Sequence, residues 1–165
     1  MAAGEERGGD WYPPHHPNCF GCGTENAASL GLRMRPEGDG VAGEVTFGEQ
    51  HMGAPGFAHG GVVAAALDDA LGMLLIRLRR AAVTRRLEVD YERPCFVGRR
   101  YELAARCERV DGRKLWLDST LSEDGEVVAR AKGLFIVVDA EHFLQGDPNS
   151  DVARRLTKRE RQLPW

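Results

Sequence analysis

The run His59-Gly60-Gly61 could do chemistry if it begins a helix, because the first turn of a helix leaves backbone N–H groups without intrahelical partners. These N–H groups and the helix dipole favour an anion or a developing oxyanion, and glycine lets a substrate carbonyl approach the backbone. Taken alone, the two glycines also fit an ordinary loop-to-helix junction. The run becomes a candidate oxyanion site when an acid–base group accompanies it.

Asp68 is an acidic residue inside an otherwise apolar run. Burying a carboxylate is costly unless it is paired or functional, and no residue one helical turn away can pair with it. Desolvation would raise the pKa of Asp68, which suits a general base near neutral pH. The alternative is a structural carboxylate. Asp69 points about 100° away on the same helix and is expected to be solvated or salt-bridged.

Gly61 and Asp68 lie seven residues apart, on one face of the predicted helix and about 10.5 Å apart along its axis. One reacting carbon cannot sit about 3 Å from both groups in the same chain. Two copies of the helix packed antiparallel would bring Gly61 of one copy near Asp68 of the other. If both residues act together, the active unit is a homodimer.

The helix that must position these groups is predicted over residues 62–80. Apolar residues recur there at helical spacing, alanines favour helix, and the run contains no proline. The helix is more apolar than one sheet face requires. Gly72 and the alanines leave room for another surface, which we expect to be a second subunit.

Alternating runs predict six strands, at residues 31–36, 41–47, 85–93, 101–110, 114–122 and 127–138. Asp111-Gly112 and Asp124-Gly125 separate the last three, and Asp-Gly between alternating runs is a strong hairpin signal. A single long apolar helix hides its stripe only if the antiparallel sheet wraps around it. The predicted class is therefore α+β, with one long central helix and a five- to six-stranded antiparallel sheet.

The 165 residues are expected to form one domain over 18–139, with a flexible arm at 1–17 and a tail at 140–165 that includes a short basic helix at 152–161. A formal charge of −3 argues against a nucleic-acid binder and gives no pull toward anionic membranes. No run reaches the roughly 18 apolar residues of a membrane span, and the first residues do not resemble a secretory signal. A cytoplasmic protein with reduced cysteines is expected.

Cys19 and Cys22 form a CxxC motif, which is typical of zinc or redox sites. The chain has two further cysteines, each single in a strand context, and two histidines in its proline-rich arm: Cys95, Cys107, His15 and His16. The histidines could complete a metal site only if the arm folded back. We therefore expect no metal, and interpret the motif as a turn before the first strand that packs Phe20 under the sheet.

His59-Gly60-Gly61 followed by Asp68 resembles the hotdog-fold thioesterases of the phenylacetate-pathway and thioesterase-superfamily type. The resemblance extends through residues 19–23, 31–33, 55–56, 87–94 and 98, and ends near Val138. It implies a helix wrapped by the sheet, a homodimer or a dimer of dimers, and hydrolysis of acyl-coenzyme A (acyl-CoA) thioesters without a resident cofactor.

The resemblance also implies a role for each matching residue. Asp68 would be the general base or the nucleophile, and Gly61 would supply the N–H that polarises the thioester carbonyl. His59 and Gly60 would hold the thioester near the helix start. The hydroxyl of Thr84 could hold the attacking water.

The nucleotide end of coenzyme A is anionic, so basic residues are expected near the dimer rim. Arg85, Arg113 and Lys114 are the candidates, together with Arg86. Arg113 and Lys114 follow the Asp111-Gly112 turn, where relatives contact the nucleotide. Each of these side chains also fits a solvated surface charge.

The sequence thus predicts an acyl-CoA thioesterase that combines Asp68 of one copy with His59 and Gly61 of another. The alternative is a non-catalytic acyl-CoA-binding or sensing module on the same fold. Met52 and Gly53 favour this alternative, because some relatives carry an Asn or Gln there. A hydratase would present an Asp and His pair in a different order, which we do not find.

Overall fold

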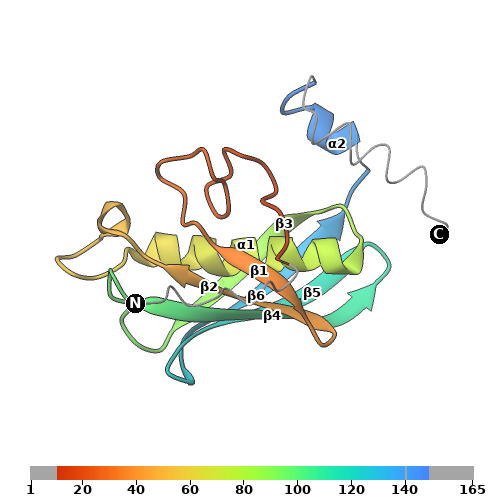
Figure 1. The fold of residues 1–165 in the computed structure, drawn as a ribbon. Coiled ribbons are helices and arrows are strands. Elements are labelled where there is room, and N and C mark those ends of the chain that lie inside the picture. The colour runs from red at the N-terminus through yellow and green to blue at the C-terminus, as the bar shows by residue number, and fades with distance from the viewer. Residues whose placement is uncertain (1–10, 140, 149–165) are drawn as a thin grey trace, which may run out of the picture.

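The computed structural model describes residues 11–139 and 141–148, which form one antiparallel sheet and one long helix (Figure 1). In chain order the elements are β1 (Arg33–Glu37), β2 (Gly40–Thr46), the 3-10 helix η1 (Glu49–His51), α1 (Gly60–Leu78), β3 (Ala82–Tyr91), β4 (Arg100–Asp111), β5 (Lys114–Glu123), β6 (Glu126–Val137) and α2 (Glu141–Leu144). The predicted helix and all six predicted strands are present.

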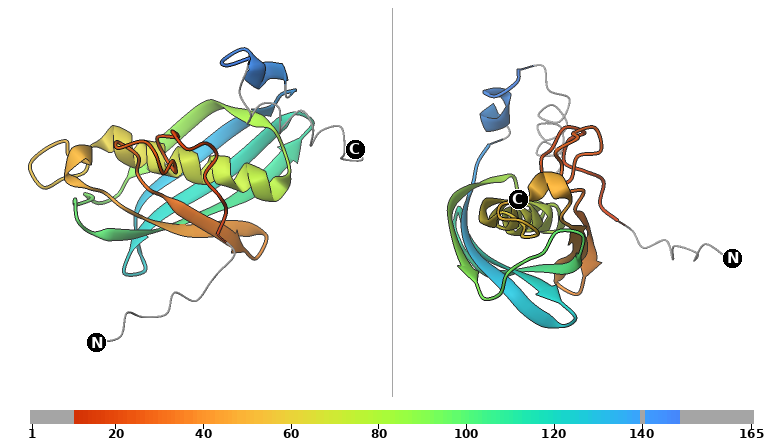
Figure 2. Two further views of the ribbon diagram at one scale, coloured as in Figure 1. Left: turned by 45° about the horizontal axis from the view of Figure 1, so that its top comes forward. Right: turned by 90° about the vertical axis from the view of Figure 1, so that its left-hand side faces the viewer.

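The six strands are ordered β1-β2-β4-β5-β6-β3, and every neighbouring pair is antiparallel. Strands β4, β5 and β6 form the predicted meander, and Gly112, Asp124 and Gly125 adopt the positive φ that its two tight turns require. The sheet curls around α1, so that helix and sheet share one core (Figure 2). This confirms the predicted fold class.

Helix α1 is shifted by two residues toward the N-terminus relative to the predicted range of 62–80. It begins earlier because His59 caps it, and it ends where Arg79 turns into the left-handed conformation, with φ of 53°. The apolar stripe is buried as predicted at Val63, Leu67 and Leu71. Their packing under the curved sheet holds the helix in place.

Strand β3 begins three residues earlier than the predicted range of 85–93 and lies at an edge of the sheet. The register with β6 shifts between Thr84 and Arg86, so Arg85 has no partner in β6. A bulge of this kind is hard to predict because the alternation of side chains breaks there. The bulge changes the direction in which the neighbouring side chains point.

The segment before β1 lies along α1, and this corrects three expectations (Figures 1 and 2). The described part of the predicted arm contacts the fold, since the Tyr12 N–H donates to the Met34 carbonyl over 2.8 Å. Phe20 is 43% exposed rather than packed under the sheet, and Cys22 is buried in its place. A Cβ at Gly72 would lie 3.3 Å from His15, so the surface that approaches Gly72 belongs to the chain's own N-terminal segment.

The described C-terminal residues form the short helix α2 after β6. The basic helix predicted at 152–161 lies outside the described residues. Across the described part of the chain, no helix is both long and apolar enough to cross a membrane. All four cysteines are free thiols.

Candidate active site

His59 sits at the N-cap of α1, and its Nδ1 accepts a hydrogen bond of 2.9 Å from the backbone N–H of Gly61. His59, Gly60 and Gly61 are all exposed at the helix start, as the oxyanion prediction requires. The Gly61 N–H, however, already has a partner within the chain. A thioester carbonyl can take this N–H only if the imidazole of His59 turns away.

The loop before α1 fixes the position of His59. The backbone N–H of His59 donates to the carbonyl of His51 over 2.8 Å, and His51 is buried. A Cβ at Gly53 would lie 3.0 Å from the Cα of His59. Residue 53 is therefore small because this backbone passes close by, which gives a physical reason for the absence of a donor side chain there.

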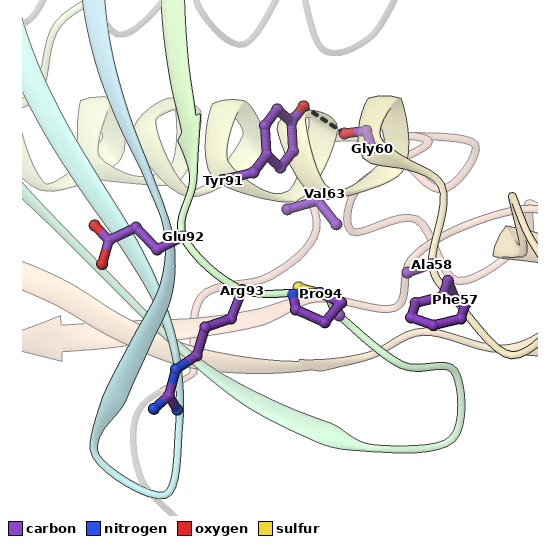
Figure 3. Close-up of a pocket in the computed structure, with 9 residues that line it drawn as sticks. Phe57, Ala58, Gly60, Val63, Tyr91, Glu92, Arg93 and Pro94 are labelled. Carbon is purple, nitrogen blue, oxygen red and sulfur yellow. Dashed lines mark hydrogen bonds between the residues drawn. The ribbon is translucent and has the colours of Figure 1, made fainter.

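A cavity of about 310 Å³ lies beside the start of α1 (Figure 3). It is lined by residues 57–58, Gly60, Val63 and residues 91–95, and its size is at the lower end of small-ligand pockets. Phe57 is 40% exposed, so an apolar group in the cavity would meet its ring. The cavity is thus suited to an acyl group.

Two cavity residues were not predicted from the sequence. The hydroxyl of Tyr91 donates to the carbonyl of Gly60 over 2.8 Å and ties the end of β3 to the helix start, as Figure 3 shows. Arg93 lines the cavity and lies 3.6 Å from Glu126. Neither side chain has a role in the site that the sequence predicts, because their approach to the helix start depends on long-range packing.

Asp68 lies half-buried near the middle of α1, and the hydroxyl of Thr84 donates a 3.0 Å hydrogen bond to its Oδ1. Desolvation by burial raises the pKa of Asp68, the hydrogen bond from Thr84 lowers it, and the negative charge of Asp69 raises it further. The net pKa is raised, as predicted from the sequence. No cation contributes to this pKa, so the described residues do not lock Asp68 in an ion pair.

Asp68 and Gly61 are not brought together within the chain. The helix is continuous between them, which separates them by about 10.5 Å along its axis. Asp68 is not among the residues that line the cavity. One chain therefore presents two separate parts of the predicted site.

The predicted basic residues lie away from the cavity. The Nε of Arg113 donates to the carbonyl of Val137 over 2.9 Å, and Val137 pairs with Ala82, just beyond the C-terminal end of α1. Lys114 is exposed beside Arg113, and Arg85 is exposed at the bulge in β3. These side chains gather at the end of α1 opposite to Gly60.

The side chains that could hold a metal ion form a second cluster against α1. Its members come from the N-terminal segment and from the helix: His15, Cys19, Cys22 and Asp69. His16 is not a member, since it is exposed and its Nδ1 accepts from the backbone N–H of Asn18 over 3.1 Å.

Comparison with known proteins gives a family for the segment that contains the predicted site. The model of the thioesterase superfamily matches residues 55–129. The acyl-coenzyme A thioesterase THEM4 of Xenopus laevis is 31% identical over 86 residues, which are 51% of this chain and 39% of that protein. The chain thus spans about two fifths of the length of the curated relatives it matches.

Solved structures show the same architecture. The thioesterase superfamily protein RHA08564 is 34% identical with a TM-score of 0.65, over 69% of this chain and 60% of the other. The protein smu.793 of Streptococcus mutans, solved with bound acetyl CoA, is 23% identical with a TM-score of 0.61, over 65% of this chain and 88% of the other. This second likeness shows the fold alone. With one long helix wrapped by six antiparallel strands, the chain has the hotdog fold, and its residues 55–129 are similar to the thioesterase superfamily.

Proposed function

We propose that the protein hydrolyses acyl-CoA thioesters, with Asp68 activating the attacking water. Water adds to the thioester carbonyl carbon while the carboxylate takes its proton. The C–S bond then breaks, and the thiolate of coenzyme A takes a proton to leave as the thiol. In the alternative route, Asp68 attacks the carbonyl carbon and expels the thiolate, and water then hydrolyses the resulting mixed anhydride. The observation that carries the proposal is a half-buried carboxylate that accepts from a hydroxyl donor and has no cationic partner among the described residues.

The proposed site is shared between two copies paired through β3. This ten-residue strand lies at the edge of the sheet, and no other strand of the described residues pairs with its outer side. A two-fold axis that pairs β3 with its copy antiparallel stands perpendicular to the sheet. Both helices then lie on the same face and run antiparallel.

In this arrangement each helix start faces the middle or the far end of the other helix. Asp68 of one copy approaches Gly61 of the second, and the basic end around Arg113 and Lys114 approaches the cavity beside Gly60. The acyl group would occupy the cavity and the phosphates of coenzyme A would meet the cations, Arg85 among them. A dimer of dimers is compatible with the same pairing.

A second candidate function is acyl-CoA binding without turnover. The hydrogen bond from the Gly61 N–H to His59 favours it, because an occupied donor cannot polarise a carbonyl. In the thioesterase, substrate binding must displace the imidazole. For either function we propose a cytoplasmic location, where four cysteines that are all free thiols would stay reduced.

The proposal is tested by thiol release from short, long and aromatic acyl-CoAs. We expect Asp68→Asn to lower kcat by about 10²–10⁴-fold, since the carboxamide cannot accept the proton from water. Asp124→Asn is the matched control, because Asp124 lies in an exposed turn at positive φ that asparagine tolerates.

Undiminished turnover in Asp68→Asn would contradict the assigned base. Binding of acyl-CoA with no thiol release from any substrate, by the wild-type protein, would support the binding module instead. Both outcomes are read from the same samples by calorimetry and by the thiol assay.

A further inference from the structure

Four side chains of metal-ligand type converge between the N-terminal segment and α1. Their ligand atoms all lie within 4.8 Å of one another, and the residues are His15, Cys19, Cys22 and Asp69. The sequence predicts no metal here, because it shows no second ligand pair and because the arm would have to fold back. The arm does fold back, and the fourth side chain comes from the helix.

The distances between these atoms fit one small ion. The Nδ1 of His15 lies 3.3 Å from the Cys22 sulfur and 3.4 Å from Asp69 Oδ1, and the Cys19 sulfur lies 3.6 Å from the same oxygen. Metal–ligand bonds of about 2.0–2.3 Å in a tetrahedron place the ligand atoms about 3.3–3.8 Å apart. These three separations fall in this range, and all four ligand atoms lie within 4.8 Å of one another.

Glycines make space for the cluster. A Cβ at Gly21 would lie 2.2 Å from the Asp69 carboxyl carbon, and a Cβ at Gly72 would lie 3.3 Å from the ring of His15. A larger residue at Gly21 would displace the Asp69 carboxylate. The absence of side chains at Gly21 and Gly72 therefore lets the Asp69 carboxylate and the His15 imidazole approach the backbone here.

The Asp69 carboxylate also lacks a partner for one of its oxygens. Oδ2 is buried and has no hydrogen bond within the described residues. A buried carboxylate oxygen without a partner is costly, and a bound cation would compensate for it. This observation is independent of the convergence of the cysteines.

We propose that His15, Cys19, Cys22 and Asp69 bind one divalent transition-metal ion, for which zinc fits the donors best. Thiolate and imidazole select zinc over magnesium or calcium, and a carboxylate completes a four-coordinate site. Because the chain supplies all four ligands, the site is closed and structural. The ion ties the N-terminal segment to α1 and is separate from Asp68, whose partner is Thr84.

The test is the metal content of the full-length protein purified without chelator. We expect about one zinc ion per chain in the wild type, and a loss of most of it in Cys19→Ser and in Asp69→Asn. Cys107→Ser is the matched control, since Cys107 is a half-buried thiol in β4 outside the cluster, and it should keep the ion.

Cobalt gives a readout that does not need a folded variant. Adding Co²⁺ to wild-type protein stripped of its metal should give the strong visible bands of tetrahedral Co²⁺ and a thiolate-to-cobalt charge-transfer band in the ultraviolet. A chelator should lower the melting temperature of the wild type, because the ion binds the folded chain and not the unfolded one. The melting temperature of Asp69→Asn should not respond to the chelator.

Two results would overturn the proposal. One is a wild-type protein that contains no metal, shows no thiolate–cobalt band and melts at the same temperature with and without chelator. The other is a thiol count showing that Cys19 and Cys22 form a disulfide in protein purified under reducing conditions. Neither result would bear on hydrolysis by Asp68.

Discussion

At the scale of single residues, Asp68 shows how local contacts set the chemistry of a carboxylate. Burial raises its pKa and the hydroxyl of Thr84 opposes that shift by donating to the charged form. A base must be deprotonated to act, so hydrolysis should increase as pH rises through this pKa. The acid limb of the pH profile should lie above the pH at which an ordinary carboxyl group titrates.

Replacing Thr84 tests this balance. Thr84→Val removes the donor while keeping the shape of the side chain, so the pKa of Asp68 should rise and the acid limb of kcat/KM should move to higher pH. Thr84→Ser keeps the hydroxyl and should leave the limb near its wild-type position. An unshifted limb in Thr84→Val would show that the hydrogen bond does not tune the base.

Single residues also mark how far the sequence leads. Asp68 stood out because a carboxylate in an apolar helix is unusual, and the resemblance pointed to Thr84. The hydrogen bond from Gly61 to His59 was not predicted. Histidine is not among the usual N-cap residues, and side-chain orientation at an exposed helix start does not follow from spacing.

At the scale of elements, α1 depends on the cap at its start. His59→Ala removes the acceptor for the Gly61 N–H and should lower the free energy of unfolding by about 1 kcal/mol. His59→Asn supplies another capping side chain and should recover most of that loss. Urea unfolding followed by circular dichroism measures both variants, and equal losses would show that the cap does not stabilise the helix.

Elements were predictable where local pattern and packing agree. The apolar stripe around Leu67 predicted α1, and the two Asp-Gly turns predicted the meander, because each signal acts within a few residues. The start of β3 was missed at the Thr84 bulge, where the alternation breaks. The predicted start of this strand was therefore wrong because tertiary pairing overrides the local pattern there.

At the scale of the whole molecule, the chain brings together residues that no local pattern connects. Cys19 and Asp69 are 50 positions apart and lie 3.6 Å from each other, sulfur to oxygen. Its position on the helix, about 100° from Asp68, predicted only a solvated or salt-bridged carboxylate at Asp69. Such a contact follows from the path of the N-terminal segment over α1. Composition alone indicated that this segment is an arm without a core pattern.

Whether two copies share one active site is also a property of the whole molecule. Mixing two inactive variants tests whether the site is shared. Asp68→Asn removes the base, and Gly61→Pro removes the N–H at a first-turn position where proline is tolerated. If each site takes Asp68 from one copy and Gly61 from the other, a mixed dimer holds one intact site and one site with both changes. Random pairing of equal amounts should then restore about a quarter of wild-type activity.

The matched control mixes Asp68→Asn with the double variant Asp68→Asn/Gly61→Pro, in which every site lacks the base and no activity should return. Size-exclusion chromatography with light scattering establishes that each variant is folded and paired before subunits are exchanged. Recovery no greater than the sum of the two separate variants, from samples that have exchanged, would place both groups in one chain. Gly61 and Asp68 are separated by about 10.5 Å along the helix axis, so no single chain can present both groups to one carbonyl and we expect recovery instead.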